Sequence, residues 1–134
     1  MSAVLMTGFP GFLGSALLPG ILAKREEATA ICIVQARHMN TAKAKLAEIQ
    51  AAHPHTVDRV QLVEGDITVR GLGLSDSVPV DDVNEVWHLA AVYDLSVPED
   101  IAKLVNIVGT NNVLQFCRER SNFRRLQHVS TCYV

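Results

Sequence analysis

The residues of this chain with the clearest chemical meaning are three glycines spaced three apart. They belong to the segment Thr7-Gly8-Phe9-Pro10-Gly11-Phe12-Leu13-Gly14. In such a loop one glycine permits a sharp turn, another lets the backbone approach a pyrophosphate, and a third lets a helix pack closely on a strand. A helix beginning there would add unpaired N–H groups and a partial positive charge. The segment therefore predicts a dinucleotide-binding loop rather than a plain structural turn.

The residues that follow the second predicted strand indicate which dinucleotide the loop would hold. An NAD site usually places Asp or Glu roughly 20 residues after the glycines, where it binds the ribose 2′-hydroxyl. This chain has Gln35, Ala36 and Arg37 there instead. Arg37 is suited to bind a 2′-phosphate as a bidentate cation. We therefore expect the cofactor to be NADP in preference to NAD.

The glycine loop needs a strand before it and a helix after it, and the sequence predicts both. Apolar runs without a polar face predict strands buried on both sides, and helical spacing of apolar residues predicts the segments between them. The expected strands are residues 2–7, 30–36, 59–64, 84–91 and 126–131, and the expected helices are residues 12–27, 41–52 and 98–119. Residues 65–83 are expected to form a loop with at most one short helix. Pro19 and Gly20 weaken the prediction of the first helix.

Alternating buried strands and helices imply right-handed crossovers and a parallel sheet with both faces covered. The predicted fold is α/β, a doubly wound Rossmann sheet of strand order 3-2-1-4-5. The length of 134 residues, with 49% hydrophobic and 19% charged residues, suits one domain over residues 1–134.

Charge and cysteine content exclude several classes of protein. Twelve basic and 14 acidic residues give a net charge of −2, so the basic footprint of a nucleic-acid-binding protein is absent. No apolar stretch is long enough for a membrane span, and we expect a cytoplasmic location. Cys32, Cys117 and Cys132 are odd in number and widely spaced. They predict buried thiols rather than a disulfide framework, and no metal site is expected.

Four further motifs follow the glycine loop along the chain. They are Gly65-Asp66-Ile67, His88-Leu89-Ala90-Ala91, Asn106-Ile107-Val108-Gly109-Thr110 and Val129-Ser130-Thr131. In these motifs and their order the chain resembles the short-chain dehydrogenase/reductase family over nearly its whole length, and the wide glycine spacing is the form expected there. The resemblance implies that Asp66 and Ile67 meet the adenine and that Leu89, Ala90 and Ala91 lie beside the nicotinamide ribose.

The individual residues in these motifs indicate one branch of the family. TGFPGFLG, GDIT, HLAAVYD and VSTCYV look closest to the thioester reductases and fatty acyl-CoA reductases, the male-sterility-type domains. By that resemblance the chain would take part in hydride transfer from NADPH to a small-molecule substrate, either a carbonyl compound or an acyl thioester. Nucleotide-sugar epimerases and dehydratases share most of these motifs and are the alternative within the family.

Two residues are candidates for the catalytic machinery. Thr131 ends the last predicted strand, at the crevice where open α/β sheets bind ligands, and the resemblance implies that its hydroxyl binds the substrate carbonyl. Such a donor would stabilise the oxyanion that develops as hydride arrives. The alternative is a threonine favoured only by strand propensity. Asn106 either holds backbone or a water relay in the active site or caps packing between helix and sheet.

The resemblance breaks at the general acid. In the family a Tyr lies four residues before a Lys, beyond the active-site Ser or Thr, but no YxxxK occurs here and Tyr133 has no Lys after it. We therefore expect the chain to be the N-terminal, cofactor-binding part of a longer reductase, with the C-terminal strands missing. The alternatives are a catalytically inactive NAD(P)-sensing or interaction module, or a fold completed by a homodimer partner or by a C-terminal segment.

Overall fold

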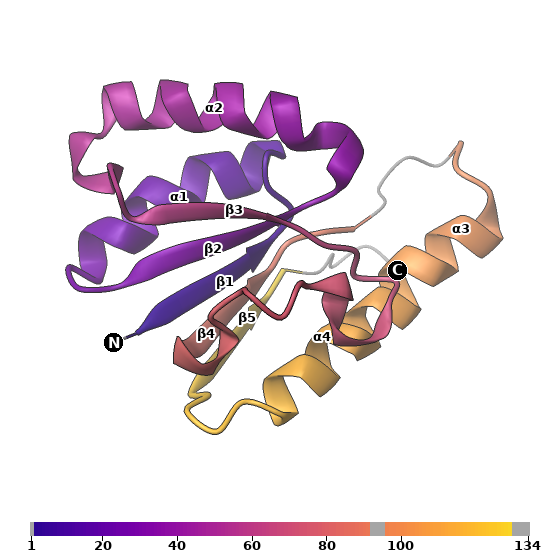
Figure 1. The fold of residues 1–134 in the computed structure, drawn as a ribbon. Coiled ribbons are helices and arrows are strands. Elements are labelled where there is room, and N and C mark those ends of the chain that lie inside the picture. The colour runs from indigo at the N-terminus through magenta and orange to yellow at the C-terminus, as the bar shows by residue number, and fades with distance from the viewer. Residues whose placement is uncertain (1, 92–95, 130–134) are drawn as a thin grey trace.

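The computed structural model describes residues 2–91 and 96–129, which form one five-stranded parallel sheet (Figure 1). The strand order is β3-β2-β1-β4-β5, and all four neighbouring pairs are parallel. The strands are β1 (Ala3–Thr7), β2 (Thr29–Val34), β3 (Val60–Glu64), β4 (Val83–His88) and β5 (Arg125–His128). The predicted α/β fold and its strand order are confirmed.

Helices cover both faces of the sheet, as Figure 1 shows. They are α1 (Phe12–Lys24) and α2 (Met39–Ala52) on one face and α4 (Gly109–Arg118) on the other, whereas α3 (Glu99–Lys103) extends beyond the carboxyl ends of the strands. Side chains of β1 alternate between the two layers because successive strand residues point to opposite faces. Val4 and Met6 pack with the α1 and α2 core, and Ala3 and Leu5 pack with the α4 core.

Several predicted boundaries are wrong by a few residues, and two segments differ in kind. Strand β4 ends at His88 rather than at residue 91. The expected helix 98–119 is interrupted by a π-helical turn, η5 (Leu104–Val108), between α3 and α4. The loop between β3 and β4 contains two short 3-10 turns, η3 (Arg70–Gly73) and η4 (Val80–Asp82), rather than at most one short helix. The remaining 3-10 turns are η1 (Ala36–His38) and η2 (Pro54–Thr56).

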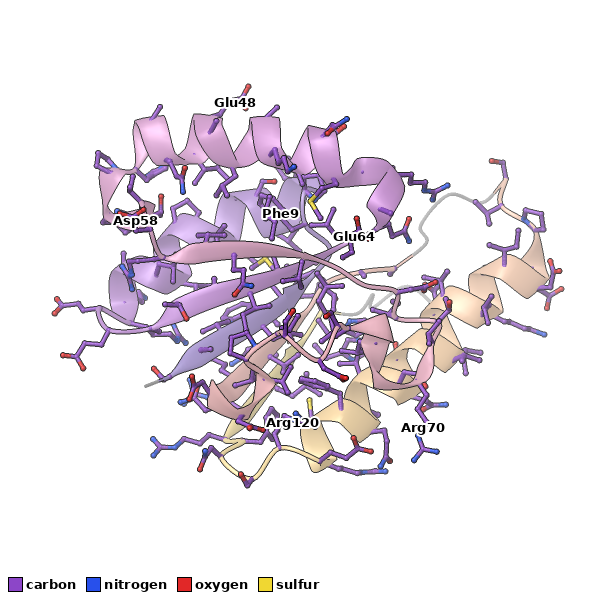
Figure 2. All side chains as sticks on the ribbon, viewed as in Figure 1. Phe9, Glu48, Asp58, Glu64, Arg70 and Arg120 are labelled. Carbon is purple, nitrogen blue, oxygen red and sulfur yellow. The ribbon has the colours of Figure 1, made fainter. Side chains whose placement is uncertain are left out.

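Helix α1 continues through Pro19 and ends against two arginines. The guanidinium of Arg59 donates to the carbonyl oxygens of Leu22 and Ala28 at 3.0 and 2.9 Å, and that of Arg25 donates to the carbonyl of Ile21 at 3.3 Å. Cations at this end complement the negative pole of the helix dipole. The other end of α1, at the glycine loop, faces the carboxyl edge of the sheet (Figure 1). In Figure 2, Asp58 lies toward the amino end of β3 and Glu64 at its carboxyl end.

Within the described ranges, no helix is both long and apolar enough to cross a bilayer.

Candidate functional site

A cleft of about 560 Å³ at the carboxyl edge of the sheet is lined by nine of the predicted site residues: Thr7, Gly8, Phe9, Pro10, Gly11, Arg37, Ile67, Ala90 and Ala91. Its walls come from the ends of β1, β2, β3 and β4 and from the apolar side of α3 and the π turn, where Ile101 and Val105 face it. None of the described residues that line it is Asp or Glu. A larger and more polar hollow of about 670 Å³ lies at the other end of the sheet, near Ser2 and Arg124, away from every predicted motif.

The glycine loop is held together by its own backbone. Gly8 has a φ of +91°, and the amide of Gly11 donates to the Gly8 carbonyl oxygen at 2.9 Å. A Cβ at Gly11 would lie 2.7 Å from that oxygen, and a Cβ at Gly14 would lie 2.9 Å from it. A Cβ at Gly8 would meet the Cβ of Leu89 at 2.9 Å. All three glycines are therefore required for the loop to pack on itself and on the end of β4, whatever ligand it holds.

The N-terminus of α1 suits an anion. Gly11 is the N-cap, no side chain among the described residues caps the helix, and its first turn contains no acid. The amides of Phe12, Leu13 and Gly14 are thus the unpaired donors that a phosphate group can accept. The Phe12 side chain is 90% exposed and borders a groove between α1 and α2 rather than the cleft. Phe12 can therefore serve the cleft only through its backbone.

Basic side chains line the part of the cleft next to β2. Arg37 lies on the wall, and its Nε donates a hydrogen bond to Oε1 of Gln35 at 3.0 Å. The two Nη groups of Arg37 take no part in this bond. His38 lines the same wall, although it was not among the residues predicted to bind the cofactor. Its position directly after Arg37 in the short turn η1 was the available signal. The two side chains present positive or hydrogen-bonding groups where a 2′-phosphate is expected.

In the predicted adenine turn, some residues line the cleft and another holds the turn in shape. Ile67 is buried and lines the cleft together with Gly65 and Thr68. The Asp66 side chain is exposed, and its Oδ1 accepts hydrogen bonds from the backbone amide of Thr68 at 2.8 Å and from the Thr68 hydroxyl at 2.6 Å. Asp66 thus orders the turn, and it is not among the residues that line the cleft.

A hydrogen bond between the side chains of Thr7 and His88 joins the carboxyl ends of β1 and β4. The Oγ1 of Thr7 accepts hydrogen bonds from the amides of Leu89 and Ala90 at 3.0 and 3.1 Å, and it lies 2.7 Å from Nδ1 of His88. Because both lone pairs of that oxygen are used, its proton is donated to Nδ1. Thr7 lines the cleft, but its hydroxyl is fully engaged by the protein. Ala90 and Ala91 face the cleft, whereas Leu89 is buried.

The other ring nitrogen of His88 extends this network to the helix. Nε2 lies 3.1 Å from Oγ1 of Thr110, whose hydroxyl donates to the carbonyl oxygen of Asn106 at 2.8 Å. Since Nδ1 accepts, Nε2 carries the proton and donates it to Thr110. Burial and the nearby His128, whose ring stacks on His88 with centroids 5.2 Å apart, lower the pKa of His88 to about 4. His88 is therefore neutral at physiological pH.

Residues 6–134 match the family model described as male sterility protein. The chain belongs to the male sterility protein family. It is 25% identical over 143 residues to the fatty acyl-CoA reductase wat of Drosophila melanogaster, an alignment that covers 98% of this chain and 28% of the relative. The chain thus spans less than a third of the length of that relative.

Solved structures place this male sterility domain among reductase domains. The terminal R domain of the myxalamid PKS-NRPS pathway superposes with a TM-score of 0.78 and 27% identity, covering 98% of this chain and 35% of that one. A thiolation-reductase di-domain from an archaeal non-ribosomal peptide synthetase gives 0.68 and 26%, covering 94% and 34%. The predicted resemblance to fatty acyl-CoA and thioester reductases is confirmed.

Of the remaining predicted residues, some lie in the described part of the chain and others lie outside it. Asn106 is exposed and lies within the π turn beside the cleft. Thr131, the candidate catalytic hydroxyl, lies outside the described residues, and so does Cys132. Cys32 and Cys117 are free and buried as predicted, and burial raises the pKa of their thiols to about 12 and about 11.

Proposed function

We propose that this chain binds NADP(H) in the cleft at the carboxyl edge of the sheet and forms the cofactor-binding part of a reductase. The observation that carries the proposal is the pairing, in one cleft, of an uncapped helix N-terminus with a basic wall at Arg37 and His38. The helix end suits the pyrophosphate and the basic wall suits the 2′-phosphate. No carboxylate from the described residues lines the cleft to hold the 2′-hydroxyl of NAD.

When bound, NADPH supplies the hydride, and the residues of this chain bind and orient it. The amides at the start of α1 would hold the pyrophosphate, Ile67 would pack against the adenine, and Ala90 and Ala91 would allow the nicotinamide ribose to approach the backbone. Ala90 is fixed there by its hydrogen bond to Thr7. Thr131 is proposed to donate its hydroxyl proton in a hydrogen bond to the substrate carbonyl, where negative charge develops.

The proposed substrate class is an acyl thioester. Its support is the relationship to a protein named fatty acyl-CoA reductase and to the reductase domains of peptide and polyketide assembly lines. Reduction of an acyl-CoA by a longer reductase that contains this chain, followed by NADPH absorbance, tests this class. A cytoplasmic location and a homodimer stay predictions.

The cofactor preference is tested by replacing Arg37 with Gln. Titration of NADP and NAD, followed by protein fluorescence, is expected to show tighter NADP binding to the wild type. Arg37→Gln should weaken NADP binding about 10- to 100-fold, the range of a charge-assisted hydrogen bond, and leave NAD binding unchanged. Equal affinities of the wild type for the two cofactors would contradict the charge argument.

Two further variants control this experiment. Arg70→Gln removes an exposed arginine that lies on the other side of the sheet from Phe9 in Figure 2 and does not line the cleft, so both affinities should stay unchanged. Gly11→Val forces a side chain against the Gly8 carbonyl and should abolish binding of both cofactors. If binding survives in Gly11→Val, the glycine loop does not hold the phosphates.

A further inference from the structure

The helical segment beside the cleft contains one widened turn, and Asn106 lies inside it. The π turn spans Leu104–Val108, and the amide of Gly109 donates to the carbonyl of Leu104, five residues earlier, as a π-helical bond requires. Val105, in the same turn, lines the cleft. Widened turns of this kind are rare and frequently lie at functional sites.

Thr110 supports the turn from within the helix. Its hydroxyl donates to the carbonyl oxygen of Asn106, four residues earlier, at 2.8 Å. In a regular α-helix that carbonyl accepts from the amide of Thr110 itself, so the hydroxyl bonds to an acceptor that the helix backbone normally uses. Side chains that bond back to the carbonyl four residues earlier are known to bend helices.

The rest of the support comes from the sheet and from the loop after β3. Nε2 of His88 lies 3.1 Å from the Thr110 hydroxyl, and Nδ1 of the same ring is held by Thr7 at 2.7 Å. On the other side, Gly109 packs so closely on Ile67 that a Cβ there would lie 2.8 Å from the Ile67 Cδ1. The start of α4 is therefore clamped between the end of β4 and the adenine turn.

We propose that His88 is a positioning residue: through Thr110 it holds the π turn open and thereby sets the place of Asn106 beside the cleft. The direction of the hydrogen bonds runs from Thr7 to His88, from His88 to Thr110, and from Thr110 to the Asn106 carbonyl. The consequence for catalysis rests on the proposed function, but the positioning itself does not.

Thr110→Val tests the link without emptying the space that Thr110 fills. It removes the hydroxyl and keeps the branched shape, and Thr110→Ser restores a hydroxyl. Amide hydrogen exchange of residues 104–110, followed by NMR, should be about five-fold faster in Thr110→Val and close to wild type in Thr110→Ser. Thr56→Val is the matched control, because it removes a similar hydroxyl-to-carbonyl bond, to His53 at 2.7 Å, away from the cleft.

The imidazole nitrogen signals of His88 provide a second readout. In the wild type, Nε2 should be the protonated nitrogen, and its signal should shift in Thr110→Val but not in Thr56→Val, because only the first loses the acceptor. Unchanged exchange of residues 104–110 in Thr110→Val would overturn the proposal, and so would an unshifted Nε2 signal.

Kinetics in a longer reductase that contains this chain separate positioning of Asn106 from a general loss of stability. Thr110→Val should lower kcat about ten-fold or more while the KM for NADPH changes less than two-fold, and Thr110→Ser should restore kcat. Equal loss of kcat in Thr56→Val would show that the effect is structural and overturn the proposal. If NADPH fails to bind while exchange still responds to Thr110→Val, the proposed function fails and the positioning role stands.

Discussion

Acidification from pH 7 to pH 5 is expected to lower the free energy of unfolding by about 2 kcal/mol through His88 alone. Burial, with a smaller contribution from His128, lowers the pKa of His88 from 6.5 to about 4. The unfolded chain therefore takes up a proton on this side chain below about pH 6.5, and the folded chain does so only near pH 4. Between these values the unfolded state binds more protons, so stability falls as the pH falls. The side chain is 1% exposed, so solvent screens little of this effect.

Urea unfolding at pH 7 and pH 5 measures the difference. The wild type and His38→Gln, which alters an exposed histidine, should each lose about 2 kcal/mol. His88→Gln should be less stable than the wild type at pH 7 but lose much less on acidification, because no buried imidazole remains to titrate. An equal acid-dependent loss in His88→Gln would refute the reasoning and assign the loss to other groups.

The packing and charge of the fold allow further predictions, all measured by urea unfolding. Gly109→Ala should destabilise the chain by about 1–3 kcal/mol, because the added Cβ would meet Ile67. Adding Ile67→Val to this variant should recover part of the loss. Full stability of Gly109→Ala alone would contradict the contact. Gly20→Ala should stabilise by about 0.5–1 kcal/mol, since a Cβ there meets nothing within 4 Å, and a loss would argue against a helical Gly20. Glu85→Gln should destabilise the chain by about 1–3 kcal/mol, because Arg25 binds both oxygens of the Glu85 carboxylate at 2.8 Å. An unchanged urea midpoint would show that this ion pair contributes nothing to stability.

The sheet could be predicted well because its signal is local. Strands β1, β2 and β4 are short, mostly apolar and mostly buried between two helical layers, whereas β3 and β5 at the edges are more polar and more exposed. The alternation of all five with helices leaves little choice of topology. Strand ends were predicted less well. Residues 89–91 continue the apolar run of β4, but Leu89 and Ala90 use their amides to bind Thr7 rather than to extend the sheet. The pattern of apolar residues does not report such a change of partner.

The candidate site could be predicted where the type and spacing of single residues indicate a function. The glycines and Arg37 have a recognisable type and spacing, and the structure places Gly8, Gly11 and Arg37 on one cleft. The π turn at Asn106 could not be predicted, because residues 98–119 keep an apolar spacing that also suits an uninterrupted helix. Its cause lies in His88, which is close to Thr110 only after the chain has folded. The role of Thr7 was missed in part for the same reason, since its hydroxyl is engaged by distant amides.

The two ends of helix α1 differ in a way that bears on how quickly an anion could bind. Arg59 and Arg25 already occupy carbonyl oxygens at its C-terminal end, while its N-terminal amides have no side-chain cap among the described residues. No capping side chain among the described residues would have to move away for an arriving phosphate. Because no carboxylate in the first turn repels it, association at this loop should be limited by diffusion and orientation rather than by a conformational change.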